Sequence, residues 1–331
     1  MATKQKILKH NASQPGIILQ PVAKTVWPSP RTTGDSRVGP AGPTSYVYMI
    51  KPNLAFYRLD EQFWYYKAHH RRNLIQPQDQ VSLELTHHVA HHPSTSLQRI
   101  IASSGAWILN FSKEAPSSME LHAIDLSPTH FRFDAAPSNV HFTQSSVTSM
   151  PRNWTRKFDF IQQSFLISSL STRDWPIAIA ELYRVLKPGG HLQIQELTSF
   201  LGVEQLNGAR PGSAAMIVRN IMAKIREKYD YLVHPPSQIV RMLEECGFKG
   251  ITCDIKEAPR LGSRFGGESG AAGLDLHVRA LKTMKEVVET NEGFGIVHDG
   301  NVFDSVMDRY ATQCEEEGLP AYECCLICAQ K

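Results

Sequence analysis

The chain has 331 residues, of which 42% are hydrophobic and 20% are charged, and its formal net charge at pH 7 is +3. This composition is typical of a soluble globular protein with a well-buried core. The small net charge and the lack of a concentrated basic run argue against a nucleic-acid or anionic-membrane partner. No stretch approaches the length of a membrane span, and residues 1–10 lack the apolar core of a secretory signal. We therefore expect a cytoplasmic protein.

The six cysteines are too few and too clustered to predict a disulfide framework. Cys325 and Cys328 have the spacing of a pair of metal ligands, but no second pair and no suitably placed histidine completes a zinc site. The pattern, which also includes Cys246, Cys253 and Cys324, indicates buried free thiols that pack as small hydrophobic side chains. We expect no metal in this protein.

Changes in composition along the chain predict three regions. Residues 1–44 are rich in Pro, Gly, Ser and Thr, which predicts a poorly ordered arm. Residues 45–93 are strongly aromatic and are predicted to form a helical cap, and residues 94–331 an α/β domain. Most of the aromatic rings in the cap are expected to pack in the core. Phe63 and Trp64 are candidates for an apolar substrate-binding wall.

The α/β domain opens with a strand, a turn, a helix and a second strand. Residues 100–102 are apolar and lead into the small-residue turn 103–105, a helix is predicted over 106–115, and the second strand runs over 119–125. This order is the first unit of a nucleotide-binding sheet. The second strand ends in Asp125, whose carboxylate is placed to accept the hydroxyls of a ribose.

The later elements follow the same alternation before an antiparallel pair closes the sheet. Residues 261–273 are rich in glycine and are predicted to form a mobile loop without a phosphate-binding motif. Strands are predicted over 140–142, 158–161, 191–196, 251–255 and 323–329, and helices over 174–186, 213–231, 238–246, 278–289 and 302–317.

Several motifs in this region resemble those of class I S-adenosylmethionine-dependent methyltransferases, and more narrowly the fungal LaeA-like branch found around secondary-metabolite pathways. The motifs are Gly105-Ala-Trp107, Ile124-Asp-Leu-Ser-Pro128, Asp174-Trp-Pro176, Arg184-Val-Leu-Lys-Pro-Gly-Gly190 and Gln195-Glu196. The resemblance implies a Rossmann-like, seven-stranded, mostly parallel sheet with helices on both faces. It also implies an N-terminal helical cap, a helical lid over residues 198–235, and a cofactor site that includes Ser103, Gly105 and Asp125.

The resemblance also suggests residues for the substrate site. Met216 and Met222 share a face of the predicted lid helix, where methionine supplies a pliable apolar wall, although such a face is more often core. His88 matches a His-His pair of the family before the first strand and is expected to line the pocket. Spacing of one helical turn between nearby histidines also suits a metal, but Pro93 ends the segment and we expect none.

The cofactor motif departs from the family at several positions. Arg99 stands where the family has an acid, and Ile101 and Ser103 replace the first two glycines. No acid follows the third strand, and Gln162-Gln163-Ser164 follows the fourth in place of a His-x-Arg pair. A buried polar atom that loses its partner costs about 1–3 kcal/mol. The sequence therefore predicts weak or no binding of S-adenosylmethionine.

Three functions are compatible with this pattern. The one it favours is a cyclase or pericyclase of Diels–Alder type, which would fold an apolar polyene intermediate of fungal natural-product biosynthesis and require no cofactor. His88, Gln162 or Arg99 would supply a hydrogen bond to a carbonyl. The alternatives are an active S-adenosylmethionine-dependent small-molecule methyltransferase and a non-catalytic LaeA-like regulator.

Overall fold

The computed structural model describes residues 96–100, 105–128, 131 and 133–331. The predicted arm and cap, and with them Phe63, Trp64 and His88, lie outside the described residues, as do Ile101 and Ser103. For residues 96–100 the backbone is described, so the side chain of Arg99 is not placed.

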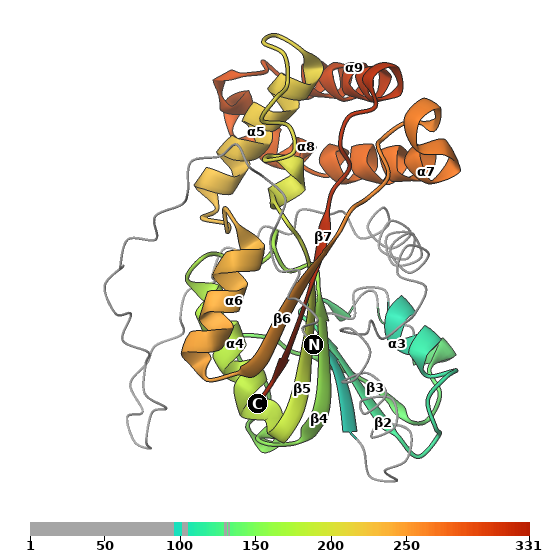
Figure 1. Cartoon of the computed structure of the whole chain (residues 1–331), viewed down its shortest axis with the longest axis vertical. Coiled ribbons are helices and arrows are strands. Elements are labelled where there is room, and N and C mark those ends of the chain that lie inside the picture. The colour runs from blue at the N-terminus through green and yellow to red at the C-terminus, as the bar shows by residue number, and fades with distance from the viewer. Residues whose placement is uncertain (1–95, 101–104, 129–130, 132) are drawn as a thin grey trace, which may run out of the picture. The chain divides into compact units, whose positions relative to one another are not determined.

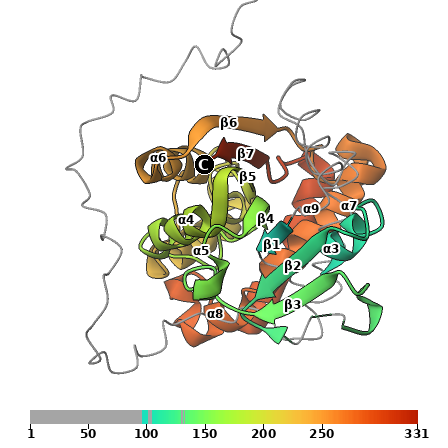
Figure 2. The same cartoon turned by 90° about the horizontal axis from the view of Figure 1, so that it is seen from below.

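The described residues form a seven-stranded sheet with the order β3-β2-β1-β4-β5-β7-β6 (Figures 1 and 2). β1 to β5 run parallel to one another, and β7 lies between β5 and β6 and is antiparallel to both. The Rossmann-like sheet and its closing antiparallel pair are therefore confirmed. The strands are β1 (Ser96–Ile100), β2 (Glu120–Asp125), β3 (Val140–Gln144), β4 (Phe158–Ser164), β5 (Leu186–Leu197), β6 (Lys249–Lys256) and β7 (Cys324–Gln330).

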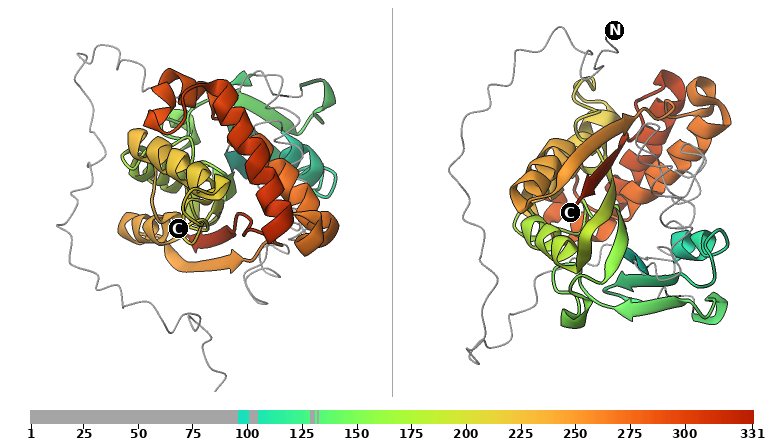
Figure 3. Two further views of the ribbon diagram at one scale, coloured as in Figure 1. Left: turned by 90° about the horizontal axis from the view of Figure 1, so that it is seen from above. Right: turned by 60° about the horizontal axis from the view of Figure 1, so that its bottom comes forward.

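Helices lie on both faces of this sheet. Successive residues of a strand point to opposite sides and therefore pack against different helices. Ile161 of β4 packs with the helices α4 and α6, whereas its neighbour Phe160 packs with α3. The helices α5, α7, α8 and α9 pack against one another (Figure 3). The bounds are α3 (Ala106–Phe111), α4 (Asp174–Val185), α5 (Ala214–Lys228), α6 (Pro235–Cys246), α7 (Ser263–Lys282), α8 (Lys285–Thr290) and α9 (Gly300–Glu317), with short 3-10 turns η2 (Phe133–Ala135), η3 (Arg152–Trp154), η4 (Phe200–Gly202) and η5 (Glu292–Gly295).

Gly105 is the residue just before α3, as predicted, and has the left-handed conformation with φ of 75°. A Cβ at this position would lie 3.1 Å from the ring of Phe142 on β3. Glycine is thus suited to the turn both by its backbone angle and by the close approach of a ring. The helix is shorter than predicted: it ends at Phe111, and residues 112–114 form a turn.

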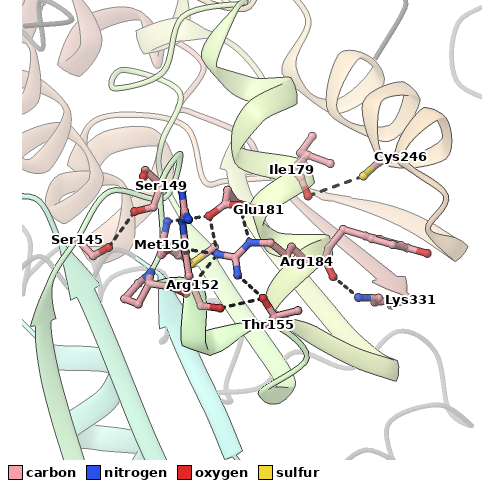
Figure 4. Close-up of polar contacts among 12 residues, drawn as sticks. Ser145, Ser149, Met150, Arg152, Thr155, Ile179, Glu181, Arg184, Cys246 and Lys331 are labelled. Atoms are coloured by element: carbon pink, nitrogen blue, oxygen red, sulfur yellow. Dashed lines mark hydrogen bonds and ion pairs between the residues drawn. The ribbon is translucent and has the colours of Figure 1, made fainter. Parts of the chain in front are cut away.

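The Lys-Pro-Gly-Gly segment lies in the first part of β5, which begins at Leu186, earlier than predicted, and directly follows α4. Lys187 Nζ lies 2.8 Å from Asp159 Oδ2 on β4, and a Cβ on Gly190 would lie 2.9 Å from the carbonyl oxygen of Lys187. Arg184, in the last turn of α4, donates to Glu181 Oε1 (2.7 Å), Thr155 Oγ1 (2.8 Å) and the Met150 carbonyl (3.0 Å), as Figure 4 shows. These contacts fix the end of α4 to the segment between β3 and β4.

The glycine-rich stretch 261–273 is not the mobile loop that its composition predicts. It forms the first half of α7, with a break at Gly267, where φ is 60° and ψ is −148°. A Cβ on Gly266 or Gly270 would lie 2.1 or 2.5 Å from the carbonyl oxygen of Arg260. The glycines therefore allow a close backbone approach, which offsets their low helix propensity of about 1 kcal/mol relative to alanine.

Two further expectations need correction. The helix predicted over 278–289 is two helices, because α7 ends at Lys282 and α8 begins at Lys285. Of the cysteines, Cys324 and Cys325 are buried as predicted, but Cys253 is exposed because β6 is the edge strand.

None of the helices within the described residues is both long and apolar enough to cross a membrane. No three His, Cys, Asp or Glu side chains of the described residues are grouped as metal ligands.

Candidate functional site at the carboxyl ends of the strands

The register of the sheet brings the ends of four parallel strands into one row. Ile100 of β1 pairs with Ile124 of β2 on one side and with Gln163 of β4 on the other, and Gln163 pairs with Ile194 of β5. Ligands of open α/β sheets bind beyond the carboxyl ends of the strands. The residues immediately past this row are therefore candidates for ligand contact.

Asp125 is the last residue of β2 and lies at one end of this site. Its Oδ1 accepts a hydrogen bond from the backbone N–H of Ser127 at 2.9 Å. Gln144, at the end of β3, donates through Nε2 to the carbonyl oxygen of Leu126 at 2.9 Å. The segment after β2 is thus held by the neighbouring strand, which keeps the carboxylate of Asp125 at the carboxyl ends of the strands.

Two buried glutamines at the end of β4 carry acceptor atoms without partners. Gln162 Nε2 donates to Ser164 Oγ at 2.5 Å, and Gln163 Nε2 donates to Glu196 Oε1 at 3.4 Å. The Oε1 atoms of both glutamines are buried and have no hydrogen-bond partner among the described residues. An unpaired buried acceptor costs about 1–3 kcal/mol, so both atoms favour a ligand that brings hydrogen-bond donors.

Glu196, on β5, is fully buried and holds the turn that follows β4. Its carboxylate accepts hydrogen bonds from the backbone N–H groups of Leu166 and Ile167, the latter at 3.3 Å. Burial raises the pKa of Glu196 to about 8, and these hydrogen bonds oppose the shift. The turn includes Phe165, a non-glycine residue with φ of 56°, so the carboxylate stabilises a strained backbone at the edge of the site.

The predicted site residues within the described chain lie in different surroundings. Gly105 is the N-cap of α3, Asp125 lies at the carboxyl end of β2, and Gln162 lies buried near the end of β4. Met216 is half-buried on α5, whereas Met222 is fully buried in the same hydrophobic cluster as Leu281 and Val306. The roles of Met216 and Met222 in substrate binding stay predictions.

Sequence reasoning missed the contribution of Gln163 and of the Glu196 carboxylate to the site. Glu196 was noted as part of a family motif, but its bond to the turn after β4 depends on residues 29 and 30 positions away. An acid between the apolar residues Ile194 and Leu197 near the end of a strand is the signal that was available, because such a residue is rarely buried without a partner.

Comparison with known proteins identifies the class of the domain. Residues 99–190 match the family described as Methyltransferase domain. Together with the strand order and the antiparallel β7, this match defines a Rossmann-like methyltransferase fold. The matched segment contains Gly105, Asp125 and the two glutamines at the end of β4.

The similarity to individual known proteins is low. The chain is 28% identical over 152 residues to Methyltransferase pytC of Aspergillus terreus, covering 45% of this chain and 44% of that protein. It is 23% identical over 154 residues to N-methyltransferase verN of Clonostachys rogersoniana, covering 46% and 51%. The aligned region spans about half the length of these curated relatives. Among solved structures, phosphoethanolamine N-methyltransferase 2 of Haemonchus contortus is 15% identical with a TM-score of 0.46, covering 82% of this chain and 57% of that one.

The described residues fit the hydrogen-bonding groups of S-adenosylmethionine, the cofactor that the class implies. The ribose of this molecule presents two hydroxyls, for which a carboxylate at the end of the second strand is a suitable acceptor. Its methionine part carries an ammonium group, and its adenine carries an amine. The unpartnered Oε1 atoms of Gln162 and Gln163 are neutral acceptors for such donors.

Proposed function

We propose that this protein is an S-adenosylmethionine-dependent methyltransferase that acts on a small molecule. The observation that carries the proposal is the placement of Asp125 at the carboxyl end of β2, one residue past Ile124, which pairs with Ile100, the last residue of β1. The family match over residues 99–190 supports the same assignment. The sequence alone favours cyclisation without a cofactor over methyl transfer. We rank methyl transfer first because of the family match.

Each polar residue at the edge has a role in this proposal. Asp125 accepts the ribose hydroxyls, and the amide oxygen of either Gln162 or Gln163, which point to opposite faces of β4, accepts a donor from the rest of the cofactor. Glu196 keeps the turn at Leu166 and Ile167 in place. When bound, S-adenosylmethionine supplies an activated methyl group, and the protein contributes mainly by orienting the acceptor.

The acceptor would bind beyond β5, where the chain offers mostly apolar surroundings. Leu197 at the end of β5 and Phe200 just after it belong to one buried hydrophobic cluster with α5, α7 and α9. We expect the apolar side chains of this segment to favour an apolar natural-product intermediate over a charged metabolite.

Calorimetric titration with S-adenosylhomocysteine and S-adenosylmethionine tests the proposal. Asp125→Asn is expected to weaken binding by about 10- to 100-fold, because hydrogen bonds to a charged group contribute about 1.5–3 kcal/mol each. The matched control is Asp254→Asn on β6, the strand at the opposite end of the sheet from β3 and β2. Its affinity should equal that of the wild type. Absence of binding by the wild-type protein, or equal affinity in both variants, would refute the proposal.

Cyclisation of an apolar polyene is the second candidate, and one observation favours it. The described ends of β3 and β4 carry Gln144, Gln162 and Gln163, which are neutral amides. An amide can polarise a substrate carbonyl without binding a cofactor. Conversion of a linear polyene by protein freed of cofactor, with no gain of a methyl group, would establish this candidate in place of the first.

A further inference from the structure

His277, on α7, is a buried histidine with one satisfied and one unsatisfied ring nitrogen. Its Nε2 lies 3.2 Å from the hydroxyl oxygen of Tyr310 on α9, and its ring stacks on Tyr322 with the centroids 3.6 Å apart. The side chain is 3% exposed. Its Nδ1 has no hydrogen-bond partner among the described residues.

The contacts of His277 and Tyr322 place both residues near the carboxyl end of β5. Tyr322 precedes β7, whose first residue, Cys324, pairs with Leu197 of β5. Gly202, which follows β5, has φ of 76°, and a Cβ there would lie 2.8 Å from the Tyr322 ring and 3.6 Å from the His277 ring. The His277–Tyr322 pair therefore lies beyond the carboxyl end of β5, where we place the proposed acceptor.

The orphan nitrogen is unusual for a site with only a structural role. A buried imidazole nitrogen without a partner is unfavourable, and a phenylalanine would fill a similar volume without that loss. The pairing of Nε2 with Tyr310 also fixes the orientation of the ring, so that Nδ1 occupies a defined position.

We propose that His277 Nδ1 is the substrate-binding contact for a hydroxyl group carried by a small, otherwise apolar acceptor. The inference rests on the proposed function for the statement that the ligand is the acceptor substrate. Tyr322 stacks on the His277 ring, and Gly202, which has no side chain, leaves room for the Tyr322 ring.

The chemistry of the histidine favours a hydroxyl over other polar groups. Burial lowers the pKa of His277 to about 3, so the ring is neutral at physiological pH and carries one proton. If the Tyr310 hydroxyl donates to Nε2, Nδ1 is a donor; if Nε2 donates to Tyr310, Nδ1 is an acceptor. A hydroxyl satisfies Nδ1 in both cases because it donates and accepts. A neutral imidazole of such low basicity orients the hydroxyl rather than removing its proton.

The test uses the full-length protein and two probes of nearly equal size, phenol and toluene, which differ by a hydroxyl and a methyl group. With ¹⁵N-histidine labelling, phenol is expected to shift the Nδ1 resonance of His277, whereas toluene leaves it unchanged. The half-buried His122 on β2 serves as the internal control, and its resonance should not move with either probe. Titration should give a several-fold higher affinity for phenol than for toluene.

His277→Phe is expected to bring the phenol-to-toluene affinity ratio close to one and to leave the affinity for S-adenosylhomocysteine unchanged. Equal shifts of the His277 resonance with both probes, or no shift with phenol, would overturn the inference, and this readout needs no variant. The outcomes also separate the two proposals. Phenol binding at His277 without binding of S-adenosylhomocysteine refutes the methyltransferase function alone, and the reverse pattern refutes the His277 assignment alone.

Discussion

Gln163 on β4 and Glu196 on β5 join two neighbouring parallel strands at the edge where the proposed ligand binds. Gln163 Nε2 donates to Glu196 Oε1 at 3.4 Å, while the other oxygen of the same carboxylate accepts from Ile167 N–H at 3.3 Å. One buried carboxylate thus orients both a strand residue with a free acceptor atom and the strained turn that follows it. The shape of the site depends on the charge state of this group.

Glu196 is predicted to make the stability of the protein depend on pH. Folding raises the pKa of Glu196 from 4.5 to about 8, so its contribution is fully present below about pH 4.5 and is lost as the pH rises towards 8. The slope is at most about 1.4 kcal/mol per pH unit. Denaturant unfolding at a series of pH values should show this fall in the wild type and lose it in Glu196→Gln. Parallel stability curves for the two proteins would contradict the assignment.

Gly190 is predicted to be required by close packing at the start of β5. A Cβ there would lie 2.9 Å from the carbonyl oxygen of Lys187 and 3.1 Å from that of Asp159, both backbone atoms that cannot move freely. Gly190→Ala should lower the free energy of unfolding by about 1–3 kcal/mol. Gly208→Ala is the control, because nothing lies within 4 Å of the added methyl group. Equal unfolding midpoints for the two variants would show that the segment adjusts.

Met222 is predicted to act through packing. Its side chain is fully buried in the cluster formed by α5, α7 and α9, so Met222→Ala should cost about 2–5 kcal/mol of stability. The half-buried Met216 on the same helix is the control, and Met216→Ala should cost clearly less. Thermal unfolding measures both. A Met222→Ala variant with unchanged stability and weakened substrate binding would instead support the lid wall that the sequence predicts.

The sequence predicts most of the sheet because its signals are local. The turn at Gly105, the acid at Asp125 and the Lys-Pro-Gly-Gly segment just after α4 each act within a few residues. The prediction of a loop at the glycine-rich start of α7 is wrong, because the close approach of Gly262 to the backbone of Cys314 and Glu315 on α9 is a contact between distant segments that composition does not reveal.

The candidate site was less predictable for the same physical reason. Asp125 follows from a strand-end pattern, but the bond between Gln163 and Glu196 joins residues 33 positions apart. The contact between His277 and Tyr310 is likewise 33 positions apart and crosses between two helices. Such pairs are fixed by tertiary packing, whereas periodicity fixes only which face a residue takes.

The most direct measurement of the central claim is a crystal structure of the protein with S-adenosylhomocysteine bound. We expect the ribose hydroxyls within hydrogen-bonding distance of the Asp125 carboxylate, and donors of the ligand within reach of the Gln162 or Gln163 amide oxygens. An adenosine group bound away from the carboxyl ends of β1 and β2, or a site filled by protein side chains that exclude it, would contradict the account.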